Sequence, residues 1–201
     1  DVKHTTKALE SLDLLVVQDM FLTDTAKIAD VVFPAAAFTE VDGFFTNSDR
    51  RVQRIRKAAE PPGEAKPDWW IISKVAQRME TPVHFEYESS EQVFDELAAL
   101  SPIYAGLNYD RIERGDLSWP VPDRDHPGTP ILHEGEFLNG KGKLQLLNYV
   151  PPSENPDDEY PFYLTTGRRL PTYHSNTMTG RSGGFRILVP NEWLEVHPAD
   201  A

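Results

Sequence analysis

Residues 164–180, LTTGRRLPTYHSNTMTG, are the part of the sequence whose side chains are best suited to chemistry. This short run holds five Thr, one Ser, two Arg, one His and two Gly. Such a composition fits three kinds of segment: a catalytic apparatus, a cradle for an anion, or a polar loop exposed to solvent. The choice among them depends on which other motifs the chain carries.

A serine-hydrolase site is the first of these possibilities. Ser175 stands next to His174, and acidic residues are near, but no G-x-S-x-G elbow surrounds any Ser of the chain. Nothing in the sequence HSNT would orient a base. The sequence therefore disfavours nucleophilic hydrolysis, and we predict no catalytic residue in this chain.

A metal site built from histidines is also disfavoured. The six His are scattered, with no i, i+4 pair and no H-E-x-x-H motif: they are His4, His84, His126, His133, His174 and His197. Cys is absent, so the chain has no disulfide, no thiolate zinc site and no Cys-held iron–sulfur cluster. We predict that no residue of this chain binds a metal.

The anion cradle is better supported. Gly167 directly follows a predicted strand, and Gly there permits a positive φ and a close approach of backbone N–H groups to an anion. Arg168 and Arg169 can pair with phosphate bidentately. Further donors are available from Thr165, Thr166, His174, Ser175, Thr177 and Thr179. From chemistry alone, a cradle and a solvated polar loop remain equally good interpretations.

Bulk composition excludes several broad classes. The 201 residues are enough for one large or two small domains, and a hydrophobic content of 39% is adequate for a core. The net charge of −12 argues against non-specific binding to nucleic acid or to an anionic membrane surface. No apolar run approaches membrane-spanning length. The chain opens DVKHTTKALE without Met, which we interpret as a processed chain or an excised segment.

The elements expected to position polar groups begin near the N-terminus. The apolar run 12–17 predicts a buried parallel strand, TDTAKIAD a helix capped by Thr23, and VVF a second strand. Such α/β units bind ligands beyond the carboxyl ends of their strands, where Gln18 and Asp19 stand. Asp19 and Asp68 could accept hydrogen bonds from a guanine edge or a ribose hydroxyl. For Asp68, stabilisation of a helix N-terminus is an equally good explanation.

Downstream elements are predicted from their apolar spacing. KPDWWIISKVAQRM and SSEQVFDELAAL predict helices, the second capped by Ser89 or Ser90, and YDRIER a helical turn. We expect a turn at Gly43 and strands at KLQLLNYV, PFYLTTG and EWLEVHPADA. The acidic linker PPSENPDDEY predicts a domain boundary. The basic cluster 50–57 is the strongest basic run of an acidic chain, and its alternating basic positions fit a strand face in solvent.

Several of these stretches resemble one known family. Residues 14–72, together with LTTGR, YHSNTMTGRS and EVHPADA, are similar to the molybdopterin-dependent oxidoreductases, and most similar to the catalytic (alpha) subunit of cytoplasmic formate dehydrogenases. The resemblance implies an α/β fold in three parts. Residues 1–64 are the end of a dinucleotide-binding α/β domain, 65–150 a helical and loop-rich continuation, and 151–201 the start of a β-barrel cofactor-binding domain.

The resemblance also implies roles for individual residues. Gln18 and Asp19 match a pair that contacts the guanosine of a molybdopterin guanine dinucleotide, and Asp68 matches another contact to it. The residues that match the pterin-dinucleotide loop are Thr166, Gly167, Arg168, His174 and Ser175, with Thr177 and Thr179 as neighbours. One departure is Val41, because relatives often carry Lys before the acid–Gly pair, here Asp42 and Gly43.

The resemblance implies an internal segment of a longer enzyme that oxidises formate to carbon dioxide in the cytoplasm at molybdenum or tungsten. The metal ligand, the iron–sulfur cluster and the electron-transfer subunits would all lie outside this chain. The alternative is a non-catalytic structural subunit of the same fold, like the large NADH–quinone oxidoreductase subunit. A Cys or selenocysteine in metal-ligand position upstream would favour the enzyme. A third possibility is a self-standing nucleotide-binding module.

Overall fold

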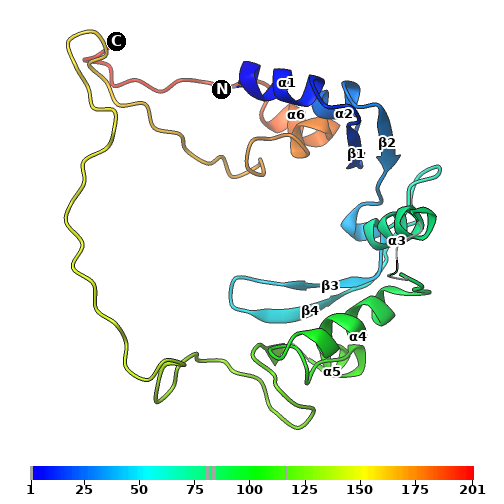
Figure 1. The fold of residues 1–201 in the computed structure, drawn as a ribbon. Helices are drawn as coiled ribbons and strands as arrows, with labels where there is room; N and C mark the ends of the chain where they lie inside the picture. The colour runs from blue at the N-terminus through cyan, green and yellow to red at the C-terminus, as the bar shows by residue number, and fades with distance from the viewer. Residues whose placement is uncertain (1, 80–81, 83–84, 116) are drawn as a thin grey trace. The chain divides into compact units, whose positions relative to one another are not determined.

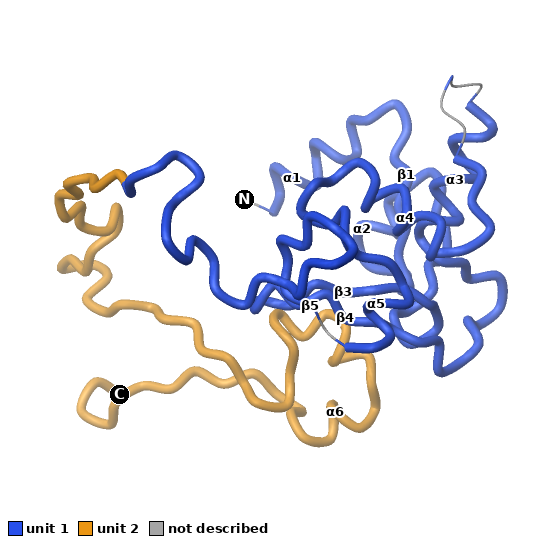
Figure 2. The backbone as a smooth tube through the Cα atoms, turned by 90° about the horizontal axis from the view of Figure 1, so that it is seen from below, with its two compact units in different colours: residues 1–142 blue, residues 143–201 orange. Residues whose placement is uncertain are grey.

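A computed structural model describes residues 2–79, 82, 85–115 and 117–201. The chain divides into two compact units, residues 1–142 and 143–201, which are coloured separately in Figure 2. His84, one of the scattered histidines, lies outside the described residues. No helix found in the described part of the chain is both long and apolar enough to cross a membrane.

The first unit begins with the predicted α/β motif (Figure 1). After α1 (Val2–Glu10), strand β1 (Val16–Asp19) pairs in parallel with β2 (Val31–Pro34), and the short helix α2 (Asp24–Lys27) connects them. The Thr23 hydroxyl accepts a 3.3 Å hydrogen bond from the Ala26 N–H, which confirms the predicted cap. The α/β motif is therefore confirmed.

The boundaries and the burial of the first strand differ from the prediction. It begins at Val16 rather than at residue 12, and Leu14 is 62% exposed. The prediction of a buried strand is wrong because this sheet has only two strands in the part of the chain that the structure describes. Each strand thus leaves one edge unpaired, and the residues of both strands are exposed or only partly buried.

A second, antiparallel sheet follows η1 (Phe38–Glu40). Its order is β3 (Gly43–Thr46), β4 (Arg51–Ile55) and β5 (Leu117–Ser118). The turn between β3 and β4 lies at Asn47, whose side-chain oxygen accepts from the N–H groups of Asp49 at 2.9 Å and Arg51 at 3.0 Å. The turn predicted at Gly43 is wrong, because Gly43 pairs with Ile55 inside the sheet.

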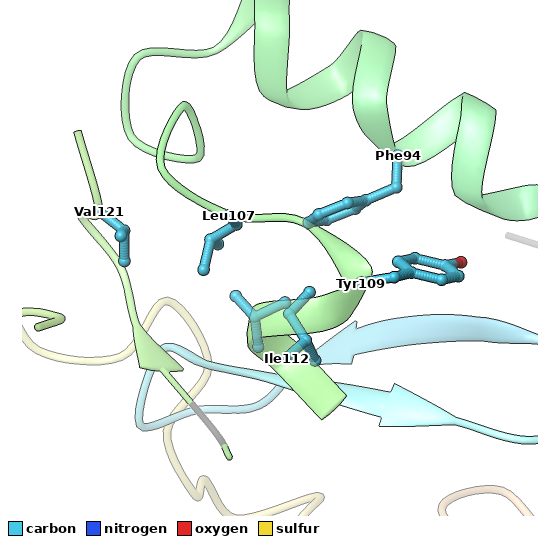
Figure 3. Packing of buried hydrophobic residues seen from close by; sticks show 6 residues of the cluster. Phe94, Leu107, Tyr109, Ile112 and Val121 are labelled. Carbon is cyan, nitrogen blue, oxygen red and sulfur yellow. The ribbon is translucent and has the colours of Figure 1, made fainter. Parts of the chain in front are cut away.

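Three helices follow in the first unit, α3 (Asp68–Arg78), α4 (Ser90–Leu100) and α5 (Tyr109–Arg114), and α4 and α5 share a core with this sheet. Their predictions are confirmed, and Ser89 is the cap of α4, accepting from the Gln92 N–H at 3.4 Å. The core cluster consists of Val52, Phe94, Leu107, Tyr109, Ile112 and Val121, most of which Figure 3 labels. The apolar face predicted for α3 is only partly correct, because Ile71 is buried whereas Ile72 and Met79 are exposed.

The second unit contains η2 (Thr179–Arg181) and α6 (Gly183–Leu188), and no strand is found between residues 143 and 201. The strands predicted at 143–150, 161–167 and 192–201 are therefore wrong, and these residues form no β-barrel. A strand requires a neighbour for its backbone N–H and C=O groups. Alternating apolar residues such as Leu144 and Leu146 have no such neighbour among the residues described and remain exposed.

Candidate functional site: two polar clusters

The first polar cluster lies at the carboxyl end of β1. Gln18 and Asp19 are its last two residues. The chain beyond β2 pairs with the segment that leads into α3, since the Lys66 N–H donates to the Pro34 carbonyl at 3.1 Å and the Ala36 N–H donates to the Lys66 carbonyl at 2.9 Å. Helix α3 therefore begins, at Asp68, beside the ends of the two parallel strands.

This arrangement brings together two of the predicted residues. The Gln18 side-chain amide donates a hydrogen bond to Asp68 Oδ1 across 50 positions of sequence. Asp68 is exposed and has no other hydrogen bond or ion pair in the described part of the chain, so its second oxygen is open to a ligand. Its place in the first turn of α3 also fits stabilisation of the helix N-terminus, because Pro67 offers no side-chain cap.

Asp19 has a different local role. Its Oδ1 accepts a 2.9 Å hydrogen bond from the Phe21 N–H, and its carbonyl accepts from the Ala35 N–H at 3.1 Å. These bonds shape the turn after β1 and join it to the end of β2. Asp19 therefore lies beside Gln18, but one of its carboxylate oxygens is already in use.

Two cavities flank the start of α3. One, of about 400 Å³, is bounded by Phe33, Lys66 and Trp70, and the Lys66 ammonium lies 5.9 Å from the centre of the Trp70 ring. No role was predicted for Lys66 from the sequence, although it stands only two residues before Asp68 and would be expected near the same site. The other cavity, of about 500 Å³, includes Val41 and Lys57. Lys57 lines the same cavity as the unusual Val41, and its ammonium there forms an ion pair with Glu60 at 2.5 Å.

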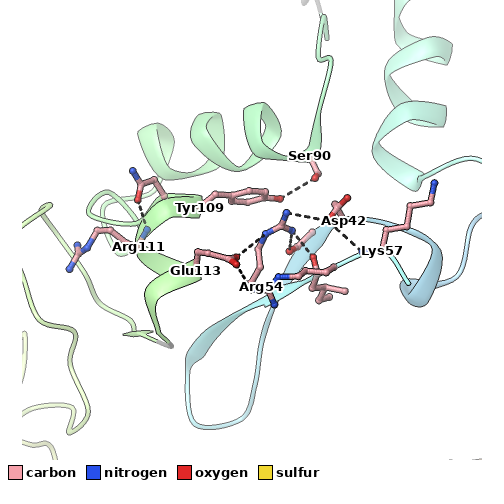
Figure 4. Close-up of polar contacts among 11 residues, drawn as sticks. Asp42, Arg54, Lys57, Ser90, Tyr109, Arg111 and Glu113 are labelled. Atoms are coloured by element: carbon pink, nitrogen blue, oxygen red, sulfur yellow. Dashed lines mark hydrogen bonds and ion pairs between the residues drawn. The ribbon is translucent and has the colours of Figure 1, made fainter. Parts of the chain in front are cut away.

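The basic cluster 50–57 is largely structural. Arg54 donates to the Gly43 carbonyl at 2.8 Å and to Asp42 at 3.1 Å, and its guanidinium lies 4.1 Å from the centre of the Tyr109 ring (Figure 4). Arg50 donates to the Thr129 and Pro130 carbonyls, each at 2.9 Å. These two side chains join separate segments of the first unit, so the strand face predicted to lie in solvent is only partly so.

The same network includes the buried ring of Tyr109 and affects the pKa of its hydroxyl. The Tyr109 hydroxyl donates to Ser90 Oγ at 3.1 Å (Figure 4). Burial raises the pKa of Tyr109, although the Ser90 hydrogen bond and the nearby Arg54 charge oppose that increase. Tyr109 therefore keeps its proton at neutral pH and donates it in the hydrogen bond to Ser90.

The second polar cluster is in the second unit. Thr166, Gly167 and Arg168 line a cavity of about 520 Å³, whose other wall includes Trp193 and Glu195. Arg168 makes no hydrogen bond or ion pair within the part of the chain described here. Gly167 does not adopt a positive φ, and a Cβ there would meet nothing within 4 Å. The positive φ that Gly permits at this position is therefore not used in this structure.

The loop after Arg169 is held by its own side chains. Ser175 Oγ lies 3.0 Å from Thr177 Oγ1, and the Thr179 hydroxyl donates to Asn176 Oδ1 at 2.6 Å. His174 and Asn176 both adopt positive φ, at 48° and 63°. No structural role was predicted for Asn176 from the sequence, although Asn adopts this left-handed region more readily than most residues. None of these loop residues lines the Arg168 cavity.

No cluster of three His, Cys, Asp or Glu side chains suited to a metal ion occurs among the residues that the structure describes. The geometry thus offers two separate sets of polar groups, Gln18 with Asp68 and the wall that contains Arg168. Each provides donors or acceptors for a polar ligand.

Comparisons with known proteins identify the family. The model of the molybdopterin oxidoreductase family matches residues 1–78. The chain is 49% identical over its full length to the F420-dependent formate dehydrogenase subunit alpha of Methanocaldococcus jannaschii, and 48% identical to a counterpart from Methanococcus maripaludis. A putative formate dehydrogenase of Bacillus subtilis is 40% identical over 98% of this chain. The chain belongs to the molybdopterin oxidoreductase family.

The matches cover only part of these relatives. The chain spans 30% of the length of the two archaeal proteins and 20% of the Bacillus protein. Among solved structures, acetylene hydratase from Pelobacter acetylenicus is similar over 56% of this chain and 15% of its own, with 25% identity and a TM-score of 0.45. A similarity at that score supports no conclusion about the fold.

Proposed function

We propose that this chain forms part of the binding site for a molybdopterin guanine dinucleotide in a molybdenum or tungsten enzyme that oxidises formate to carbon dioxide. The observation that carries the proposal is the 49% identity over the whole chain to a formate dehydrogenase alpha subunit. The matched region covers the whole chain and therefore includes both polar clusters.

The chemistry of the two clusters fits such a dinucleotide. The free oxygen of Asp68, oriented by Gln18, suits the N–H groups of a guanine edge or a ribose hydroxyl, with Asp19 beside them. In the second unit, the Arg168 guanidinium suits a phosphate. The proposed contacts in that unit are Thr166, Gly167, Arg168, His174, Ser175, Thr177 and Thr179.

The reaction assigned to the whole protein is the loss of two electrons and a proton from formate, which yields carbon dioxide. The metal carried by the dinucleotide supplies the redox chemistry, and this chain's residues bind and orient the dinucleotide. The chain contains no Cys. We therefore assign the metal ligand and the iron–sulfur cluster to other parts of the protein, and place none among the residues of this chain.

Two further assignments follow the relatives. Three relatives at 45–49% identity are named F420-dependent, so F420 is the electron acceptor that we assign to the whole protein, with formate as substrate and electron-transfer subunits as partners. The assigned location is the cytoplasm. The division into residues 1–64, 65–150 and 151–201 belongs to the same proposal.

The test uses the full-length protein, purified from its own organism or a host that makes the cofactor. We expect about one molybdenum or tungsten atom per chain by mass spectrometry of the metals, with a fluorescent pterin released on oxidation. Formate should reduce F420 in the presence of the partner subunits. A preparation that is folded but contains neither metal would contradict the proposal and favour the structural subunit, in which the upstream Cys or selenocysteine would also be missing.

A further inference from the structure

One cavity of the second unit contains two charged side chains without partners. The cavity of about 520 Å³ lies between residues 164–169 and 192–195. Of its four charged residues, Arg169 and Glu192 form an ion pair with each other at 2.8 Å. Arg168 and Glu195 make no hydrogen bond or ion pair within the described part of the chain. The cavity therefore presents one free guanidinium and one free carboxylate.

The partnered residues hold the two walls together. The Arg169 guanidinium donates to the Asn191 carbonyl at 2.8 Å and lies 4.2 Å from the centre of the Trp193 ring. Its side chain is only 18% exposed. We call Arg169, Glu192 and Trp193 the clamp. Arg169 and Glu192 are paired with each other in the clamp. Arg168 and Glu195 lie outside the clamp and remain available to a ligand.

The two free groups define the ligand's chemistry. A guanidinium binds phosphate through two parallel N–H donors. An ionised carboxylate only accepts hydrogen bonds, and its two oxygens suit a pair of adjacent donors. Adjacent ring N–H and amino groups occur on the 2-amino-4-oxopyrimidine edge, which guanine and pterin share. A ligand that carries both this edge and a phosphate would satisfy both side chains of the cavity.

We infer that Glu195 binds the 2-amino-4-oxopyrimidine edge of a guanine or a pterin, while Arg168 binds a phosphate of the same ligand. This inference rests on the proposed function for the identity of the natural ligand. It goes beyond that function by assigning selection for the amino group to Glu195, the first residue of the stretch EVHPADA, to which the sequence assigned no role.

The experiment uses cofactor-free full-length protein and two pairs of probes. GDP is compared with inosine diphosphate, which lacks the 2-amino group, and pterin is compared with lumazine, which also lacks it. Because a hydrogen bond to a charged group is strong, the wild-type protein should prefer the amino member of at least one pair by about tenfold or more, as measured by calorimetry. The pair that shows the preference identifies the bound edge.

The variants test whether Glu195 is the cause. Glu195→Gln replaces one acceptor oxygen by an amide donor, so, in an Asp68→Asn protein that lacks the other proposed guanine acceptor, the preference should fall to about onefold. Glu159→Gln, an equal change of charge at an exposed position of the same unit, should keep it. Glu195→Asp retains the charge on a shorter side chain and should give an intermediate preference, which provides a second measurement if the Gln variant folds poorly.

Two results overturn the inference: equal binding within both pairs by the wild-type protein, or a preference that survives in Glu195→Gln. Neither result affects the proposed function, which depends on metal and pterin in the wild-type holoenzyme. Conversely, a holoenzyme without pterin would contradict the proposed function even if Glu195 selected GDP.

Discussion

The two polar clusters are positioned by different means. Gln18 and Asp68 are 50 residues apart and meet because backbone hydrogen bonds join β1 to β2, and β2 to the segment that begins α3. The residues from Arg168 to Thr179 are close in sequence and are held by the clamp and by hydrogen bonds within their own loop. The first cluster thus depends on a sheet and a helix, whereas the second depends on a few side chains.

Because of this difference, a destabilising substitution should disrupt the two clusters to different extents. Loss of the core around Phe94 should affect the antiparallel sheet together with α4 and α5, because these elements share that core. Loss of one clamp residue should alter only the second cluster. Four pairs of substitutions test these expectations.

The largest expected effect is in the core of the first unit. Phe94 is fully buried, and its ring packs edge-on against Phe44 at 4.2 Å between centres. Phe94→Ala should lower the free energy of unfolding by about 3–5 kcal/mol, because it removes a large apolar side chain and leaves a cavity. Urea unfolding measures this change.

Leu100→Ala on the same helix is the control. Leu100 is 76% exposed, and its replacement should cost less than about 0.5 kcal/mol. Equal losses would show that the core is not where the structure places it.

The next effect concerns the contacts that join β3, β4 and α5. The Arg54 side chain is 16% exposed and bonds to Gly43 and Asp42. Arg54→Met should cost about 2–3 kcal/mol, because it leaves partly buried acceptors without a donor. Arg56→Met removes an exposed ion pair to Glu113 and should cost under about 1 kcal/mol. Thermal unfolding of both variants measures the difference, and a larger loss for Arg56 would reverse the assignment.

The third test separates the two adjacent arginines of the second unit. Arg169→Ala should destabilise that unit by about 1–2 kcal/mol, because it removes a stacking contact and charged hydrogen bonds. Arg168→Ala should change stability by less than about 0.5 kcal/mol, since the side chain has no partner in the described chain. In the full-length protein, however, Arg168→Ala should lower the content of metal and pterin. Unchanged occupancy in that variant counts against the cradle.

The smallest structural effect is expected at Gln18. Gln18→Ala removes one exposed hydrogen bond to Asp68 and should cost about 0.5–1 kcal/mol. Gln77→Ala removes an exposed bond to the Phe85 carbonyl and should cost a similar amount. Only the Gln18 variant should lose pterin dinucleotide from the full-length protein. If both variants retain it equally, the Gln18–Asp68 pair has a purely structural role.

Prediction from sequence succeeded where the signal was local. Helix α4 follows from its apolar spacing and the cap at Ser89, and α2 from the cap at Thr23, because both depend on neighbouring residues. It failed for KLQLLNYV and PFYLTTG, whose alternation is typical of strands. A strand also requires a paired neighbour, which the local pattern does not reveal.

The sequence by itself determined the family, the two polar motifs and the caps of the helices, because these depend on residue types at short spacing. Only the tertiary structure decided that Gln18 meets Asp68, that Arg54 is committed to the β3–β4 hairpin, and that Arg168 is free while Arg169 is not. Two adjacent arginines are equivalent in a sequence. They become different when one of them reaches Glu192 and Trp193, more than twenty positions away, and the other remains without a partner.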